Sequence, residues 1–268
     1  MNQNLVRLAR GLRLSGLLDN LELRLHEAAA NSLPHAEFLE LILGDEANVR
    51  AGRLLERRVK AANFREKKTL EDFDFAFNGA LNRRQFYDLA TGEFIRQRRD
   101  LVLIGPPGVG KSHLVQAVGY AAIKAGFNVL YRSVFDVVRE LGAEETVAGE
   151  NRLLARYLKP DLLIIDDMGM KQLPPKSGEI LFEIIMRRYE NRSTVMTTNR
   201  PLEDWGKLLA DVPSASAILD RLLHHAEIIQ IQGRSYRLKE RAAQKHGDKA
   251  PAAAADSAPP NKTGKEKK

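Results

Sequence analysis

The sequence contains no cysteine, which excludes disulfide bonds, thiolate metal sites and cysteine nucleophiles. Aromatic residues make up only 6% of the chain, and this scarcity weighs against a surface that stacks the bases of single-stranded nucleic acid. No stretch approaches the roughly 18 to 20 consecutive apolar residues that a membrane-spanning helix needs. The N-terminus alternates Arg with Leu and lacks the uninterrupted apolar core of a signal peptide. We therefore expect a cytoplasmic protein without disulfides.

Length and charge narrow the class further. A chain of 268 residues is long enough for one α/β domain of ordinary size and a smaller companion domain. Hydrophobic residues at 44% can build a substantial core. The formal net charge of +7 favours an anionic partner such as nucleic acid, although many basic proteins bind no DNA.

Three regions of the chain differ in pattern. Residues 1–68 carry leucines at helical spacing and no convincing strand, which predicts a small all-α N-terminal domain. Residues 69–240 alternate short apolar runs with helical patterns, as in a parallel sheet with crossover helices. Residues 241–268 are rich in Ala, Pro and Lys and have almost no large apolar side chain, so we expect a disordered basic tail there.

Within the N-terminal region, Pro34 favours the start of a helix that carries Phe38 and Ile42 on its apolar side. Further along, Leu54, Leu55 and Val59 predict a next helix. Between residues 35 and 60 we therefore expect two consecutive helices.

The strongest motif is the segment LVLIGPPGVGKSHL at residues 101–114. It reads as a buried strand, then the pattern G-x-x-x-x-G-K-[ST], then the start of a helix. Glycines let such a loop wrap so that its N–H groups face phosphate oxygens, and the helix N-terminus adds a favourable field. Lys111 is predicted to reach the β- and γ-phosphates of ATP, and the Ser112 hydroxyl to ligate Mg²⁺. The residues predicted to contact the nucleotide here are Gly105, Pro106, Pro107, Gly108, Val109, Gly110, Lys111, Ser112 and His113.

A second, acidic motif follows about 50 residues later in DLLIIDDMG, where a continuous apolar run ends in Asp166 and Asp167. Ligands gather at the carboxyl ends of buried parallel strands. We predict that Asp166 holds Mg²⁺, through water, and that Asp167 polarises the attacking water. An Asp pair after a strand can also simply cap the next turn, but the preceding phosphate-loop motif favours the catalytic interpretation.

Four segments in order, GPPGVGKSHL, LLIIDDMG, STVMTTNRP and ILDRLLHHAEII, resemble the AAA+ proteins of the helicase-loader and initiator branch. The likeness is greatest to the IstB-like transposition helper ATPases, which are related to DnaC-like helicase loaders. It runs from about residue 5 to residue 240 and includes KTLEDFDFAFN and GRSYRLKE. The resemblance implies an α/β P-loop AAA+ core with a parallel five-stranded sheet and an ATPase that self-associates. It further implies that the protein assembles on duplex target DNA and recruits or activates the transposase of the same element.

The resemblance assigns roles to three more residues. Asn199 matches sensor 1, which orients the lytic water, although an Asn before Arg-Pro also forms turns. Arg221 matches the arginine finger that reaches the γ-phosphate of a neighbouring subunit; the plain alternative is a surface ion pair with Asp220 or Glu227. Arg237 resembles sensor 2.

Asp167 and the segment KTLEDFDFAFN, which precedes the phosphate loop, each add a detail. Most AAA+ motors place Glu where this chain has Asp167, whereas the IstB-like branch commonly has Asp. The shorter side chain predicts slow, partner-stimulated hydrolysis that acts as a timer. Phe73 and Phe75 frame the adenine pocket in one interpretation and belong to the core in the other.

Two basic helix faces are candidates for DNA contact. Between the strand NVLYRS and the Asp166 strand lie two helical patterns, Val134–Leu141 and Glu150–Leu158, where an ordinary crossover needs one. The extra helix matches the DNA-contacting insertion of the initiator and loader branch. Either face could instead be only a solvated helix surface. The candidate DNA-contacting residues are Arg50, Arg53, Arg57 and Lys60 in the N-terminal region, and Arg152, Arg156 and Lys159 in the extra helix.

Two other functions remain open from the sequence. One is a DnaC-like replicative helicase loader acting on single-stranded DNA, against which the missing Cys cluster of some loaders weighs slightly. The other is a metabolic P-loop kinase, in which Arg221 would have no neighbour to serve.

Overall fold

The computed structural model describes residues 2–79, 81–209 and 211–238. The basic tail predicted at residues 241–268 lies outside these described residues. Across the described helices, none combines the length and the apolar character required to cross a membrane.

Five parallel strands form the central sheet of the described chain, in the order β2-β3-β4-β1-β5. The strands are short, and β1 to β4 are buried along almost their whole length, as expected for strands that are covered on both faces. The predicted α/β fold with a parallel five-stranded sheet is confirmed. The strands are β1 (Asp100–Ile104), β2 (Val129–Ser133), β3 (Leu162–Met168), β4 (Ser193–Thr198) and β5 (Ala226–Gln230).

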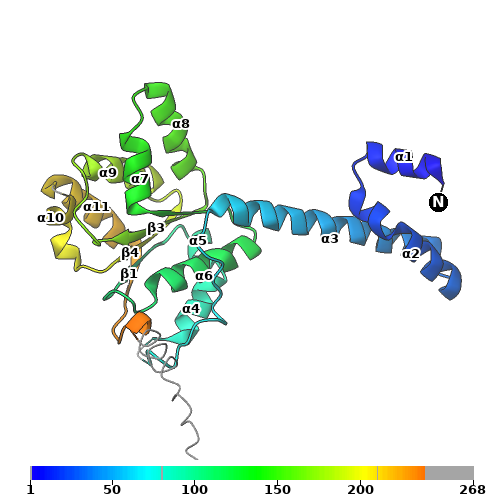
Figure 1. Cartoon of the computed structure of the whole chain (residues 1–268), viewed down its shortest axis with the longest axis horizontal. Coiled ribbons are helices and arrows are strands. Elements are labelled where there is room, and N and C mark those ends of the chain that lie inside the picture. The colour runs from blue at the N-terminus through cyan, green and yellow to red at the C-terminus, as the bar shows by residue number, and fades with distance from the viewer. Residues whose placement is uncertain (1, 80, 210, 239–268) are drawn as a thin grey trace, which may run out of the picture.

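Helices cover both faces of this sheet (Figure 1). One face carries α4 (Arg83–Ala90), α5 (Glu93–Arg96) and α6 (Lys111–Lys124). The other carries α7 (Val134–Gly142), α8 (Val147–Leu158), α9 (Ser177–Arg188), η1 (Leu202–Asp204), α10 (Trp205–Leu209) and α11 (Val212–His225).

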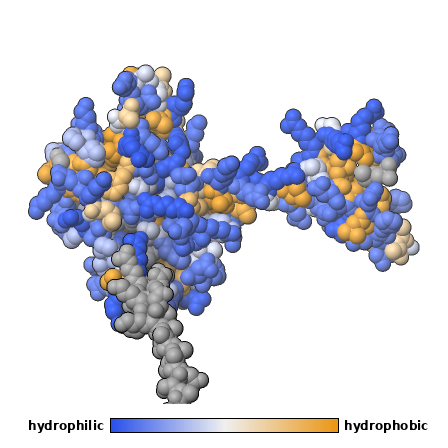
Figure 2. All heavy atoms as spheres, viewed as in Figure 1, coloured by the Kyte–Doolittle hydropathy of each residue, from blue (hydrophilic) through white to orange (hydrophobic). Residues whose placement is uncertain are grey.

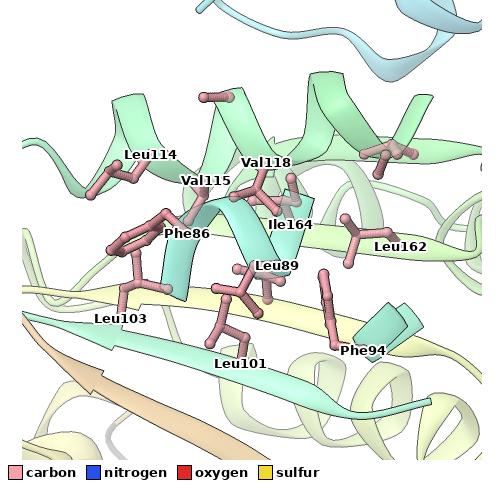
Figure 3. Packing of buried hydrophobic residues seen from close by; sticks show 14 of the residues in the cluster. Phe86, Leu89, Phe94, Leu101, Leu103, Leu114, Val115, Val118, Leu162 and Ile164 are labelled. Carbon is pink, nitrogen blue, oxygen red and sulfur yellow. The ribbon is translucent and has the colours of Figure 1, made fainter. Parts of the chain in front are cut away.

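Alternation along the strands divides the interior into two apolar cores. In β3, Leu162 and Ile164 pack into the core under α4–α6, whereas Leu163 and Ile165 pack into the core under α7–α11. Figure 3 shows the first core, with Phe86 of α4 lying among side chains of β1 and α6. The sheet is thus fixed from both sides, which holds the ends of its strands in place.

The two helical patterns between β2 and β3 are confirmed as α7 and α8. Ser133 caps the start of α7, because its side chain accepts a hydrogen bond from the N–H of Phe135. Thr146 caps α8 in the same way, through the N–H of Gly149.

The N-terminal region consists of α1 (Gln3–Gly11), α2 (Ser15–Asn31) and α3 (His35–Ala62). The expectation of two helices between residues 35 and 60 was wrong, because α3 is one continuous helix of 28 residues. No proline interrupts it, and its internal glycines weaken a helix without ending it. In Figure 1 it extends away from the sheet as a rod and carries α1 and α2 at its far end. We call α1, α2 and α3 the N-terminal arm.

The arm has a small core of its own, made by Ala9, Leu17, Leu21 and Ile42. Beside it the buried carboxylate of Glu46 accepts the N–H of Leu17 at 3.0 Å. Many leucines of the arm stay exposed, and orange apolar patches are visible on its surface in Figure 2. Such patches are typical of surfaces that bind other macromolecules.

Asp100 at the start of β1 makes stability depend on pH. Its carboxylate is buried and accepts the N–H of Thr194 at 2.6 Å, and burial raises its pKa to about 6. The pKa of Asp100 is thus higher in the folded protein than its value of 3.8 in the unfolded chain, so Asp100 stabilises the fold fully below pH 3.8. This stabilisation is lost as the pH rises through about 6. Asp100→Asn keeps an acceptor oxygen without the charge. Relative to this variant, the free energy of unfolding of the native protein should fall by about 2 kcal/mol between pH 4 and 7. Urea denaturation at several pH values measures it, and parallel curves would contradict it.

Candidate functional site

The predicted phosphate loop lies between β1 and α6, at the carboxyl edge of the sheet. Two of its glycines are required by geometry, because Gly108 and Gly110 have φ of 83° and 97°. A Cβ on Gly108 would lie 2.1 Å from the Ser235 hydroxyl, and one on Gly110 would lie 2.5 Å from the ring of Phe73. The loop therefore leaves no room for side chains where neighbouring segments cover it.

The segment after β5 closes over this loop. Ile231 donates its N–H to the carbonyl of Ile104 at 2.7 Å, and Tyr236 donates its N–H to the carbonyl of Gly108 at 3.0 Å. The ring of Tyr236 meets Phe77 edge-on with centroids 5.2 Å apart. Residues 231–237 thus form one wall of the site.

Lys111 is the first residue of α6, and its side chain is buried. Its ammonium group donates to the carbonyls of Gly105 at 2.7 Å and Pro106 at 2.9 Å. Burial lowers the pKa of Lys111, while the negative charges of Asp166 and Asp167 act in the opposite direction. The loop therefore encloses a cation at the N-terminus of a helix, which is the arrangement that binds phosphate.

A cavity of about 630 Å³ opens over the loop, within the size range of small-molecule sites. Most of the predicted nucleotide contacts line it. Gly105 and Pro106 do not; their carbonyls instead hold Lys111. The predicted site residues on its wall are Pro107, Gly108, Val109, Gly110, Lys111, Ser112, His113, Asp167, Asn199 and Arg237.

The two neighbouring carboxylates of β3 have different surroundings. Asp166 is fully buried and accepts from the hydroxyls of Tyr131 (2.5 Å) and Thr197. Asp167 has a φ of 68° next to an irregularity in the β3–β4 pairing, and its side chain faces the cavity. Its carboxylate lies 2.7 Å from the guanidinium of Arg65.

A divalent cation fits the oxygen donors at this end of the cavity. Ser112 lines the cavity, and each oxygen of Asp166 keeps a second acceptor position beyond the bond it already makes. Hydroxyl, carboxylate and water oxygens are the ligands that Mg²⁺ prefers. Asp166 itself has no exposed surface and does not line the cavity, so its contact with the ion through water stays a prediction.

Asn199 follows β4, and β4 pairs directly with β1, the strand that leads into the phosphate loop. With its amide nitrogen turned toward the protein, Asn199 donates to the carbonyls of Gly169 at 2.9 Å and Met168 at 3.2 Å. This orientation fixes the side chain at the cavity wall, with its oxygen available as an acceptor.

The two arginines assigned by resemblance lie in different places. Arg237 lines the cavity. Arg221 is on α11, does not line the cavity of its own chain, and has its guanidinium 5.3 Å from the ring centroid of Tyr189. Of its two alternative partners, Asp220 lies 3.5 Å away, whereas Glu227 contacts Arg99 and Gln85 instead.

Phe73 and Phe75, the two phenylalanines predicted either to frame the adenine pocket or to belong to the core, also lie in different places. Phe73 lines the cavity and meets the ring of His113 edge-on, with centroids 5.2 Å apart. Phe75 packs against Phe86 and Tyr87 on the core side.

The two basic faces lie on separate elements, α3 and α8, which point in different directions from the sheet (Figure 1). On α3, Arg50 pairs with Glu46 at 2.6 Å, and Arg53 donates to the hydroxyl of Ser15. On α8, Arg156 pairs with Glu140 of α7 at 3.2 Å. The structure therefore ties part of each face to neighbouring helices. Arg57 and Lys60 extend the first face, and Arg152 and Lys159 extend the second.

Three residues of the site were missed by sequence reasoning: Arg65, Tyr131 and Thr197. Tyr131 and Thr197 belong to strands that were predicted, but their hydroxyls meet Asp166 only after three strands come together. Arg65 is about 100 residues from Asp167 in sequence, so no local pattern links the two.

The parallel sheet, the loop between β1 and α6 and the acidic end of β3 define a P-loop protein of the AAA+ class. A family model of IstB-like ATP-binding proteins matches residues 7–244. The chain belongs to this family.

Relatives agree with this assignment, and solved structures share the fold. A protein of Pseudomonas aeruginosa named for ATP binding in insertion sequence IS21 is 37% identical over 230 residues, 86% of this chain and 87% of the relative. Its counterpart for IS5376 of Geobacillus stearothermophilus is 34% identical over 222 residues, 83% of this chain and 88% of the relative. Two solved structures share the fold: DnaI, with a TM-score of 0.51 and 24% identity over 63% of this chain and 90% of its own, and AMPPCP-bound DnaA from Aquifex aeolicus, with a TM-score of 0.53 and 22% identity over 71% and 58%.

Tyr131→Phe tests the support of the buried carboxylate. Burial and the charge of Asp166 raise the pKa of Tyr131, so its hydroxyl is a neutral donor to that carboxylate. Losing this donor should lower the free energy of unfolding by about 1 to 2 kcal/mol in urea denaturation at pH 7. Tyr87→Phe, at a half-buried surface position, is the matched control and should change it by less than about 0.5 kcal/mol. Equal effects of the two variants would contradict this role of Tyr131.

Proposed function

We propose that this protein is an ATPase that assists transposition of an insertion element. It binds Mg-ATP, assembles on duplex target DNA, and recruits or activates the transposase of the same element. One observation carries the proposal: a single cavity brings Lys111, Asp167, Asn199 and Arg237 together over the phosphate loop of an IstB-like chain.

The chemistry follows from the position of each group. Loop N–H groups and the N-terminus of α6 hold the phosphates, and Lys111 leaves its loop carbonyls to contact the β- and γ-phosphates. Ser112, and Asp166 through water, would hold Mg²⁺, which would neutralise phosphate charge. Asp167 and Asn199 orient a water whose oxygen attacks the γ-phosphorus. The bond from this phosphorus to the bridging oxygen breaks, and the proton of the water passes to Asp167 and then to the released phosphate.

The rate of this reaction is expected to be low in the isolated protein. The Asp167 carboxylate sits about one methylene farther from the water than a Glu would, and Arg65 engages it. Slow hydrolysis that a partner stimulates suits a timer for target selection, whereas motor-like turnover of the isolated protein would contradict it.

Several features support DNA binding and self-association. The net charge of +7 and the basic faces of α3 and α8 suit contacts to the phosphate backbone, which give affinity with little sequence specificity. Arg221 is half-exposed on α11 and away from its own cavity, where it is available to a neighbouring subunit. Exposed leucines of the arm supply apolar surface for association. The names of the relatives, which refer to insertion sequences, support transposition as the process.

Lys111→Ala tests the nucleotide site. Loss of the buried cation should weaken ATP binding at least about tenfold and abolish ATP-dependent assembly on DNA. Binding of a fluorescent ATP analogue measures the first effect, and sedimentation with duplex or single-stranded DNA measures the second. Circular dichroism and thermal unfolding verify that the variant is folded. Native-like ATP binding and assembly by a folded variant would refute the proposal, and assembly on single strands alone would favour the helicase-loader alternative.

The role of Arg221 is tested by mixing two inactive variants. If Arg221 acts on a neighbour, Arg221→Ala subunits keep an intact nucleotide site, and Asp167→Asn subunits, which retain Lys111 and so still bind ATP and assemble, keep an intact finger. An equal mixture should then recover about a quarter of the native ATPase rate, because a quarter of the subunit interfaces pair the intact halves. ATPase assays of each variant alone and of the mixture on duplex DNA give the answer. A mixture no more active than its separate components would assign Arg221 to its own chain or to the surface.

A further inference from the structure

The end of α3 is fixed against the sheet. Ala62 is fully buried, and Asn63 ends the helix in the left-handed conformation with φ of 58°. The Phe64 ring then packs between α6 and β2. The centroid of the Phe64 ring lies 6.0 Å from that of the Tyr131 ring. A Cβ on Gly119 would lie 3.1 Å from atoms of the Phe64 ring, so the ring packs closely on α6. Only Asn63 and Phe64 separate the last residue of α3 from Arg65, so a displacement of α3 that shifts Phe64 in its packing moves Arg65 as well.

Arg65 is the next residue, and it reaches the hydrolysis centre. Its guanidinium lies 2.7 Å from the Asp167 carboxylate and 5.9 Å from the ring centroid of Tyr131, whose hydroxyl donates to Asp166. Both Arg65 and Asp167 line the cavity. Arg65, three residues after α3, thus contacts both the proposed catalytic carboxylate of Asp167 and the ring of Tyr131, whose hydroxyl donates to Asp166.

This contact restrains Asp167. A carboxylate that accepts from a guanidinium is held in one rotamer, turned toward the cation. The Arg65 side chain is 52% exposed, so solvent screens the pair, and a small movement of the backbone is enough to break it.

We propose that Arg65 is a positioning residue that restrains Asp167 until a duplex DNA bound along α3 displaces the end of the arm. This rests on the proposed ATPase function. The occupant of the arm is a polyanion, because the basic face of Arg50, Arg53, Arg57 and Lys60 runs along the same helix that ends three residues before Arg65. Binding there moves Arg65 away and frees the carboxylate.

The experiment is steady-state ATP hydrolysis by the full chain carrying Arg65→Gln, with and without duplex DNA. Without DNA, kcat should rise about three- to tenfold while KM for ATP changes less than about twofold, and the stimulation by DNA should shrink by the same factor. Arg65→Lys keeps a cation and should retain the low basal rate. Arg58→Gln removes the same charge from the last turns of α3, away from the cavity, and should leave basal turnover unchanged. Arg65→Met is a second neutral variant in case Arg65→Gln does not fold.

Combining Arg65→Gln with Asp167→Asn shows whether Arg65 acts through Asp167. If it does, Arg65→Gln should give no acceleration in a protein that already carries Asp167→Asn. An unchanged or lower kcat for folded Arg65→Gln and Arg65→Met would overturn the inference. A change in KM alone would overturn it too, since Arg65 would then serve ATP binding. Absence of any ATP hydrolysis by the native protein with DNA would instead contradict the proposed function, so the two failures are distinguishable.

Discussion

The arrangement of the site depends on one buried carboxylate. Asp166 of β3 accepts from Tyr131 of β2 and from Thr197 of β4, so hydroxyls of the two neighbouring strands meet on its two oxygens. Thr197 also accepts the N–H of Asp167 at 3.1 Å. These bonds join three strand ends at the carboxyl edge of the sheet. A buried charge without such donors would destabilise the fold by several kcal/mol, so the polar groups that define the site also keep it folded.

At this edge of the sheet, the two neighbouring aspartates of β3 have different surroundings. The alternation of β3 and its irregular pairing with β4 place one carboxylate inside the protein and the next at the cavity wall. The inner group is rigid and shielded. Within the described part of the chain, the outer carboxylate of Asp167 has one ion-pair partner, Arg65, which lies three residues after α3. The different positions of the two adjacent aspartates thus follow from strand geometry.

The local parts of this structure were predictable from sequence. The phosphate loop, the strands β1 to β4 and the helices α7 and α8 all have short-range patterns, because periodicity, glycine spacing and capping act within a few residues. The contacts that join these local parts were not predictable from the sequence. The partners Arg65, Tyr131 and Thr197 come from distant segments, and the ion pair and hydrogen bonds exist only after the sheet is assembled. The continuity of α3 was missed because clusters of apolar residues separated by Gly44 and Gly52 look like two helices. The roles of Asn199, Arg221 and Arg237 still rest on resemblance, since geometry places two of them at the cavity and the third on an exposed helix.

The order of the strands also constrains how the chain folds during synthesis. Both neighbours of β1 come later in the sequence, β4 from residue 193 and β5 from residue 226, and residues 231–236 then cover the phosphate loop. A ribosome-bound chain that has already made its loop still lacks the strands and the wall that shape it. The strands and the wall that shape the nucleotide site therefore become available last, after nearly the whole described chain has been synthesised.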